Sequence, residues 1–248
     1  MRDTGSHAAA SDTGLIRKNN EDSYAIVTRD DPFPCGLVIA DGMGGHRKGE
    51  LASRIAVDYA SERILAQMES IPDRALLPRI LADICEKANV KIFLGSLESE
   101  ENRGMGTTLT IAIVFKDQLV LAHVGDCRAY LFRNSTLMQL TVDHTLVQEM
   151  IDAGTLSEEE SVTHPRRNVL TRALGAPEYM QADTLTLPLS RGDRVLFCTD
   201  GLHGAVSEEM IRNVLRKEKS PELAVARLVA LANEQGGEDN VTVLVVNL

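Results

Sequence analysis

The sequence contains no tryptophan and few other aromatic residues. Four Tyr and five Phe are spread over 248 residues, which leaves few rings for stacking against nucleic-acid bases. Basic residues are also scarce, since 26 Lys and Arg stand against 36 Asp and Glu, a formal net charge of −10. Because binding to a phosphate backbone depends on basic residues, we expect no nucleic-acid partner.

Long apolar runs are missing as well. No stretch reaches the roughly 18 apolar residues that a membrane-spanning helix needs, and the first residues lack the apolar core of a secretory signal. We therefore expect a cytoplasmic protein with no membrane partner. The four cysteines form no CxxC pair, which argues against a zinc ribbon. Each lies in an apolar stretch, and we expect a buried, reduced thiol at Cys35, Cys85, Cys127 and Cys198.

Apolar runs rich in β-branched residues recur from end to end, and several are continuous, as in strands covered on both faces. The predicted strands are Ser23–Val27, Gly36–Ala40, Thr107–Phe115, Leu119–Val124, Ala129–Phe132, Arg194–Cys198 and Val241–Asn247. Helical periodicity predicts long helices around Ala52–Ala60 and Leu81–Ile92, and further helices that begin after Ser207 and at Pro221. No repeat or long linker divides the chain, so we expect one domain over residues 1–248.

Two regions show little regular pattern. The residues around His7 are expected to form a loose terminus. Between Thr141 and Gly175, a short helix at Leu146–Ala153 is indicated, followed by an acidic run at Glu158–Glu160. An irregular stretch of this length inside a compact chain is often a functional loop.

Six carboxylates stand where apolar strands begin or end, at Glu21, Asp22, Asp41, Asp126, Asp200 and Asp239. A lone Asp-Gly pair is usually a hairpin turn. Here, however, helical segments rather than returning strands follow Asp41-Gly42 and Asp200-Gly201. If the carboxylates converge, divalent cations such as Mg²⁺ or Mn²⁺ would offset their mutual repulsion. Spacing alone does not establish that convergence.

Several short segments add a more specific signal because they occur in one order along nearly the whole chain. They are Arg17–Asp22, Asp41–Gly45, Gly104–Thr108, Val124–Arg128, Asp143-His144, Thr199–Leu202 and Asp239–Thr242. Together they resemble the metal-dependent protein phosphatase family (PPM, the type 2C serine/threonine phosphatases) in its compact bacterial form. The resemblance implies an α+β fold, a four-layer α–β–β–α sandwich with two central antiparallel sheets. It also implies a single phosphatase domain with a flap at about residues 144–170.

The same resemblance implies hydrolysis of phosphoserine and phosphothreonine in proteins by a metal-activated water, without a phosphoenzyme. Two Mn²⁺ or Mg²⁺ ions would be held, with a weaker third ion in bacterial members. Asp41 would bridge the first two ions. Asp200 and Asp239 would hold the first, and Glu21 and the backbone carbonyl of Gly42 would lie at the second.

Three further roles follow from the resemblance. Asp126, together with Asp200, is similar to the weaker third metal site. Asp22 is similar to a metal-site residue that orients bound water. Arg17 would grip the substrate phosphate, because a guanidinium matches two phosphate oxygens. The implied partners are phosphorylated proteins, such as the activation loop of a serine/threonine kinase or a phosphorylated anti-sigma-factor antagonist, and we expect a monomer.

Two positions depart from the family pattern. Met43 stands where some relatives carry a histidine that is a candidate general acid. His46 and His144 are alternatives, although a surface role and a loop-anchoring role respectively are favoured for them. His203 stands where relatives often carry a small polar residue, close to Asp200, and neutral variation is the favoured interpretation.

Three competing functions fit the sequence less well. Cys127 and Arg133 have the Cys-x5-Arg spacing of cysteine-dependent tyrosine phosphatases, but the intervening residues predict a strand rather than a phosphate-binding loop. A catalytically inactive, regulatory relative is disfavoured because the expected carboxylates and Arg17 are all present. The glycine-rich segment Gly42–Gly49 lacks the spacing of either nucleotide-binding motif.

Overall fold

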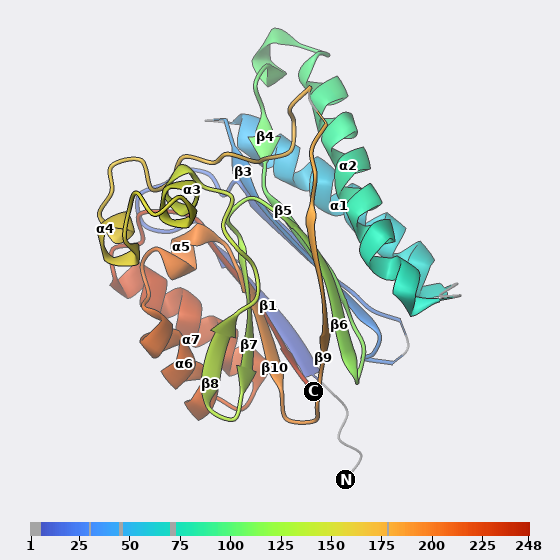
Figure 1. The fold of residues 1–248 in the computed structure, drawn as a ribbon, viewed down its shortest axis with the longest axis vertical. Coiled ribbons are helices and arrows are strands. Elements are labelled where there is room, and N and C mark those ends of the chain that lie inside the picture. The colour runs from blue at the N-terminus through green and yellow to red at the C-terminus, as the bar shows by residue number, and fades with distance from the viewer. Residues whose placement is uncertain (1–5, 30, 45–46, 70–72, 178) are drawn as a thin grey trace.

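Two antiparallel sheets packed face to face form the centre of the protein in a computed structural model, which describes residues 6–29, 31–44, 47–69, 73–177 and 179–248 (Figure 1). One sheet has the strand order β1-β11-β10-β7-β8. Its strands are β1 (Ser6–Asp12), β7 (Arg128–Arg133), β8 (Thr136–Gln139), β10 (Arg194–Cys198) and β11 (Val241–Asn247). The other has the order β2-β3-β5-β6-β9, with β4 paired to β3. Its strands are β2 (Asp22–Val27), β3 (Cys35–Met43), β4 (Gly106–Thr107), β5 (Leu109–Val114), β6 (Gln118–Val124) and β9 (Asp183–Pro188).

Helices cover the outer face of each sheet (Figure 1). Helices α1 (Arg47–Glu69) and α2 (Leu77–Ser96) pack on the six-stranded sheet, with short 3₁₀ turns η1 (Arg74–Leu76) and η2 (Glu100–Asn102) beside α2. Helices α5 (Asp200–His203), α6 (Glu208–Lys217) and α7 (Pro221–Glu234) pack on the five-stranded sheet. The remaining helices are α3 (Leu146–Asp152) and α4 (Glu158–Val162). This arrangement confirms the expected four-layer α–β–β–α sandwich.

The apolar core is divided among the three interfaces between these layers. Leu37, Leu121, Phe197 and Leu244 lie between the two sheets and are buried. Every residue of β5 and β10 is buried, which explains why their sequences are continuously apolar rather than alternating. The four cysteines are buried free thiols, as predicted.

Strand β3 and the strand predicted at Thr107–Phe115 differ from expectation at the point where they meet. Strand β3 continues past Ala40 to Met43, and the other strand is interrupted at Thr108 into β4 and β5. The interruption has a clear cause, because the Thr108 hydroxyl accepts a hydrogen bond from the Asp41 N–H at 2.8 Å. A side chain thus takes the place of a regular ladder bond beside Asp41.

The prediction of a loose terminus around His7 was wrong for the described residues. Strand β1 pairs along its whole length with β11, from Ser6↔Asn247 to Asp12↔Val241. Its alanines contribute little hydrophobic signal, although Ala8 and Ala10 pack on the core beneath α7. Strands β8 and β9 were also missed. They lie at the sheet edges and are at most half-buried, so they lack the apolar runs of the central strands.

The helix starts were predicted well. Ser207 caps α6, Pro221 is the first residue of α7, and the short helix expected after Leu146 is α3. The acidic run at Glu158–Glu160 forms the first turn of α4, where Ser157 and Glu160 make a reciprocal capping box. No helix among the described residues combines the length and apolarity needed to cross a bilayer.

Candidate metal and phosphate site

The carboxylates predicted from the sequence converge at one edge of the sandwich, where strands of both sheets end. Asp22 and Asp41 are direct neighbours across β2 and β3. Asp200 starts α5 directly after β10, and Asp239 lies just before β11. Burial raises the pKa of Asp41 well above its ordinary value, and the charges of Asp22, Asp200, Asp126 and Asp239 raise it further. These side chains therefore share one region of negative potential.

Asp22 is one of the two most enclosed of these residues, with 9% of its surface exposed. Its Oδ2 accepts hydrogen bonds from the hydroxyls of Thr242 at 2.7 Å and Thr199 at 2.9 Å, both from the opposite sheet. Its Oδ1 is buried and has no hydrogen-bond partner. Burial raises the pKa of Asp22 to about 7, against the lowering effect of the two hydroxyls.

Asp200, like Asp22, has a raised pKa and one carboxylate oxygen without a hydrogen-bond partner. Burial, followed by the charge of Asp239, raises the pKa of Asp200 to about 6, against the lowering effect of the neighbouring Asp41 carboxyl. The Oδ1 of Asp200 is also buried without a partner. Buried carboxylate oxygens that the protein leaves unsatisfied are costly. They are the ligand type that Mg²⁺ and Mn²⁺ prefer, so the residues present fit the predicted ions.

Glycines allow the predicted second metal position to form. A Cβ on Gly49 would lie 2.4 Å from Glu21 Oε2 and 2.7 Å from the Gly42 carbonyl oxygen, and a Cβ on Gly42 would lie 2.2 Å from the Gly49 carbonyl oxygen. Side chains are therefore excluded at both positions. The structure brings the Glu21 carboxylate and the Gly42 carbonyl together against the first turn of α1.

Arg17 lies at the rim of the carboxylate group. Its Nη2 is 2.8 Å from Asp239 Oδ2, and its side chain is 54% exposed. Burial alone would lower the pKa of the Arg17 guanidinium, but Asp239, Glu21 and Asp200 raise it overall. The guanidinium is thus a charged, accessible group beside the carboxylates.

The carboxylates are near one another without enclosing a single point. Among the described residues, no three Asp, Glu, His or Cys side chains are gathered as closely as the ligands of a bound ion. Arg17 occupies one oxygen of Asp239. Its other oxygen accepts the Asn240 N–H at 2.8 Å, and the carboxylate retains lone pairs with which it could bind an ion.

Two sets of supporting residues were missed by the sequence analysis. Asn240 Oδ1 accepts the Glu21 N–H at 2.8 Å, and its Nδ2 donates to the carbonyls of Thr13 at 2.8 Å and Asn19 at 3.0 Å, so it fixes the loop that carries Arg17. Thr107 Oγ1 donates to the Asp41 carbonyl at 2.8 Å. Both lie inside the segments used for the family resemblance, which was the available signal.

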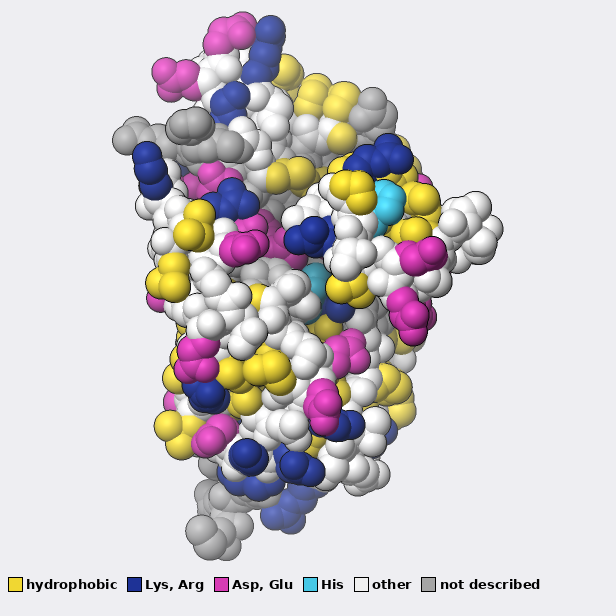
Figure 2. Space-filling view, turned by 90° about the vertical axis from the view of Figure 1, so that its left-hand side faces the viewer, with side chains coloured by type: hydrophobic (Ala, Val, Ile, Leu, Met, Phe, Trp, Pro, Cys, Tyr) yellow, Lys and Arg dark blue, Asp and Glu magenta, His cyan; other side chains and the backbone are white. Residues whose placement is uncertain are grey.

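A cleft of about 460 Å³ opens beside the carboxylates, lined in part by Asp126, Arg128, Asp143, Asp200 and His203. Figure 2 views the side of the molecule that lies on the left in Figure 1. It shows acidic side chains in a hollow in the upper half of that side, with Lys and Arg side chains around the hollow. Asp126 is 8% exposed, and burial and the charge of Asp200 raise its pKa well above the ordinary value.

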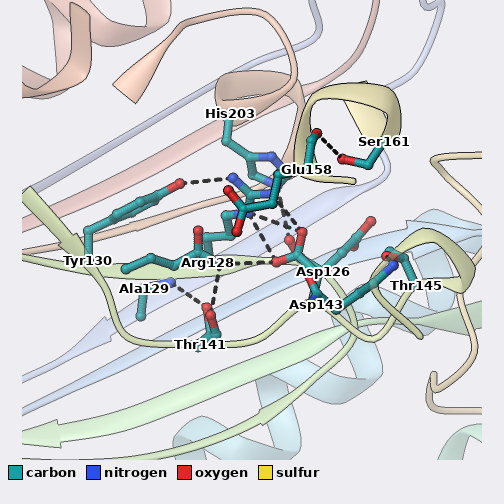
Figure 3. Close-up of polar contacts among 12 residues, drawn as sticks. Asp126, Arg128, Ala129, Tyr130, Thr141, Asp143, Thr145, Glu158, Ser161 and His203 are labelled. Carbon is teal, nitrogen blue, oxygen red and sulfur yellow. Dashed lines mark hydrogen bonds and ion pairs between the residues drawn. The ribbon is translucent and has the colours of Figure 1, made fainter. Parts of the chain in front are cut away.

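Arg128 organises the floor of the cleft. Its Nε and Nη2 donate to the Asp143 carboxylate at 2.8 to 3.1 Å, and its Nη1 donates to the Tyr130 hydroxyl at 3.2 Å (Figure 3). Asp126 lies beside Asp143 in the same view. Sequence reasoning gave no role to Arg128 because nothing along the chain indicates its pairing with Asp143.

The three histidines and the methionine singled out from the sequence lie in different surroundings. His46 lies outside the described residues. His144 is 2% exposed and does not line the cleft, in agreement with a loop-anchoring role. His203 lines the cleft and contacts the Asp126 carbonyl at 3.0 Å, which the interpretation as neutral variation did not foresee. Met43 ends β3 against Gly106 and supplies no proton donor there.

The tyrosine-phosphatase alternative is contradicted. Cys127 is fully buried and its Sγ lies 3.1 Å from the Thr108 hydroxyl. Burial raises the pKa of the Cys127 thiol well above its ordinary value, whereas a nucleophilic cysteine needs a lowered pKa. Arg133 lies at the far end of β7, paired with Asp193.

Comparisons with known proteins show the family to which the chain belongs. The chain matches the family described as protein phosphatase 2C over residues 16–242. It is 39% identical over 235 residues to the serine/threonine phosphatase stp of Listeria welshimeri, covering 95% of this chain and 92% of that protein.

Solved structures show the same similarity. The serine/threonine phosphatase of S. agalactiae superimposes with a TM-score of 0.91 at 32% identity, covering 98% of this chain and 99% of that one. The catalytic domain of the phosphatase PstP, solved in complex with two manganese ions, gives a TM-score of 0.83 at 36% identity, covering 98% and 97%. The chain therefore belongs to the protein phosphatase 2C family.

Proposed function

We propose that the carboxylate site hydrolyses phosphoserine and phosphothreonine in proteins with the help of two Mn²⁺ or Mg²⁺ ions. One observation carries this proposal, namely the convergence of buried and half-buried, partly unsatisfied carboxylates from five separate chain segments beside an accessible guanidinium. Bound ions would supply an activated water as the nucleophile and would offset the charge on the phosphate. Because the activated water would be the nucleophile, no side chain would attack the phosphorus and no covalent phosphoenzyme would form.

The residues that would hold the ions are those that the family resemblance implies. Asp41, the direct cross-strand neighbour of Asp22, would contribute to both ions. Asp239 and Asp200 would hold one of them, and Glu21 with the Gly42 carbonyl would hold the other. Asp126 and Asp200 would form a third, weaker site.

The chain's own residues then perform three tasks. Asp22, whose Oδ2 is fixed by Thr199 and Thr242, would offer its unpartnered Oδ1 as an acceptor that orients the water. Arg17, which contacts Asp239 at the rim, would bind two oxygens of the substrate phosphate with its guanidinium. The geometry of Asp41 is held throughout by Thr107 and Thr108.

We further propose that residues 1–248 act as one catalytic domain, monomeric and cytoplasmic, which opposes a serine/threonine kinase and binds neither nucleic acid nor membranes. The formal net charge of −10 supports the exclusion of nucleic acid. Residues 144–170, which include α3 and α4, would act as the flap that contacts the substrate, because Ser161, Val162 and Arg167 line the cleft.

The test is phosphate release from a phosphothreonine peptide, measured with Mn²⁺, with Mg²⁺ and with a chelator, alongside a phosphotyrosine peptide of the same sequence. We expect metal-dependent release from phosphothreonine that the chelator abolishes. The Asp193→Asn protein is a matched control, since it removes a buried carboxylate outside the site. Absence of release with either metal, from a protein that binds Mn²⁺ and is folded, would refute the proposed activity.

A further inference from the structure

The turn between β6 and β7 carries Asp126 and has unusual constraints. Gly125 adopts a positive φ of 109°, and a Cβ at this position would lie 2.5 Å from the Thr108 Cβ. Both backbone groups of Gly125 bond to one residue: its N–H donates to His144 Nδ1 at 3.0 Å, and its carbonyl accepts the His144 N–H at 2.8 Å. The turn is thereby attached to the start of the 144–170 segment.

A second imidazole holds the other side of the same turn. His203 Nε2 lies 3.0 Å from the carbonyl oxygen of Asp126, to which it donates (Figure 3). His203 is the last residue of α5, the helix that begins with Asp200. The bond therefore ties the backbone of Asp126 to the short helix that carries Asp200.

We propose that His144 and His203 are positioning residues that set the Asp126 carboxylate relative to Asp200. This inference rests on the proposed function, in which these two carboxylates hold the third metal ion. Neither imidazole acts as a general acid. His203 fixes the separation of the two ligands, and His144 transmits the position of the flap to the Asp126 turn.

The hydrogen-bond directions define the tautomer of each ring. His144 Nδ1 accepts the Gly125 N–H and carries no proton, so the proton is on Nε2, which faces Asp183 Oδ2 at 3.2 Å. Arg172 holds the same Asp183 carboxylate at 2.7 Å. His203 faces a carbonyl and must also carry its proton on Nε2. Both rings are thus expected to be Nε2–H tautomers.

Substitutions can separate positioning from mere packing. His203→Gln keeps a donor near the place of Nε2, whereas His203→Ala removes it. His144→Asn keeps an acceptor near the place of Nδ1, whereas His144→Ala removes it. Residues that orient metal ligands typically contribute about 10–100-fold to metal affinity. We therefore expect each Ala variant to weaken the lowest-affinity Mn²⁺ site about 10-fold or more, and each conservative variant to stay within about 3-fold of wild type.

The experiment is calorimetric titration of Mn²⁺ into the metal-free full chain, with Asp126→Asn and His7→Ala, on β1 at the end away from the site, as controls. Thermal unfolding without metal identifies any variant that fails to fold, and the conservative variants then carry the test. Loss of the weakest site in Asp126→Asn with no change in either Ala variant would overturn the positioning proposal alone. Retention of that site in Asp126→Asn would overturn the third-site assignment on which the proposal rests.

A second readout does not depend on metal. Imidazole ¹⁵N spectra of the metal-free protein should show Nε2–H tautomers for His144 and His203, identified by the signals that disappear in each substitution. An Nδ1–H tautomer or a doubly protonated ring at either position, near neutral pH, would contradict the proposed hydrogen bonds.

Discussion

The two ends of strands β10 and β11 both bury charged side chains, but the sign and the surroundings of those charges differ. At the end away from the site, Arg194 is 6% exposed. Its Nε donates to Asn247 Oδ1 and its Nη1 donates to the carbonyls of Leu215 and Glu218, while its Nη2 is buried without a partner. Asp193, at the same end, pairs with Arg133 through two hydrogen bonds. At the opposite end, Asp22 and Asp200 each have a buried oxygen without a partner.

This difference distinguishes charges that the fold itself offsets from charges that remain available to a ligand. Arg194 donates hydrogen bonds to carbonyl groups at the C-terminal end of α6, where a helix favours a cation. The charge of Asp193 is offset by Arg133. The carboxylates at the site repel one another, and Arg17 bonds to one of them only at the rim. Asp193 and Arg133 offset each other's charge, whereas the excess of negative charge at the site favours a cationic ligand there.

The sharpest way to break this comparison is to neutralise Asp41, the carboxylate proposed to contribute to both ions. Asp41→Asn, and equally Asp239→Asn, should lower metal-dependent phosphate release by more than about 100-fold, because even outer-shell changes cost about 10–100-fold in metal sites. The measurement is the initial rate with Mn²⁺ and a phosphothreonine peptide. A wild-type rate in either variant would defeat the assignment of that residue.

Removing the accessible guanidinium should have the next largest effect. We expect Arg17→Ala to lower kcat/KM about 100-fold, since a donor aimed at developing charge contributes on this scale. Arg17→Lys should recover only part of the loss, because an ammonium lacks the two-pronged geometry. Steady-state kinetics on a phosphothreonine peptide would measure both, and equal rates for Arg17→Ala and wild type would show that Arg17 does not bind the phosphate.

A substitution at the opposite end, where Asp193 pairs with Arg133, should change the stability of the protein rather than its activity. Asp193→Asn leaves Arg133 without its partner and weakens the acceptor for the Ser190 N–H. We expect Tm to fall by about 5 °C, while kcat stays within about 2-fold of wild type, as for substitutions remote from a site. Calorimetry and the phosphate-release assay would test both halves. A large loss of activity at unchanged Tm would mean that the two ends are not separable.

The pH dependence of the metal-free protein should reveal the unbalanced charge. Asp200 titrates near 6 when folded and near 3.9 when unfolded, so between these values the folded state holds more protons and its stability falls as the pH rises. Buried His123 and His203, with pKa values lowered to about 3 and about 4, act in the opposite direction.

A variant isolates the contribution of Asp200 from that of the histidines. The Tm of metal-free Asp200→Asn should exceed that of wild type by an amount that grows by several degrees from pH 4 to pH 7. Saturating Mn²⁺ should remove the wild-type disadvantage, because binding requires the deprotonated ligand. A Tm difference that stays constant over this range would contradict the raised pKa.

The smallest effect is expected at Cys127, which lies at the site end but is buried behind it. The Ser hydroxyl of Cys127→Ser can keep the hydrogen bond to Thr108, so we expect activity within about 3-fold of wild type and a modest loss of stability. Phosphate release from phosphothreonine and phosphotyrosine peptides would check this. Abolished activity in a folded variant would revive the cysteine-dependent mechanism.

The sequence predicted the central strands because they are buried on both faces and therefore continuously apolar, as β10 shows. It did not predict β1, whose alanines are weak signals, or the interruption at Thr108, which depends on a side-chain bond to a strand distant in sequence. The carboxylates could be named from their positions at strand ends. Their convergence, and the contacts of His203 and Asn240 around them, depend on pairings between distant segments that no local pattern encodes.

The pairing of β1 with β11 also has a consequence for how the protein becomes active during its synthesis. Arg17 and Glu21 follow β1, whereas Asp239 immediately precedes β11, and Asn240 holds the loop between them. The N-terminal part of the site, which is synthesised first, is therefore completed only when residues close to position 248 have been synthesised. While β11 is still inside the ribosome, the chain lacks the pairing of β1 with β11 and the support that Asn240 gives to the loop of Arg17, so we expect dephosphorylation to begin only after β11 has emerged.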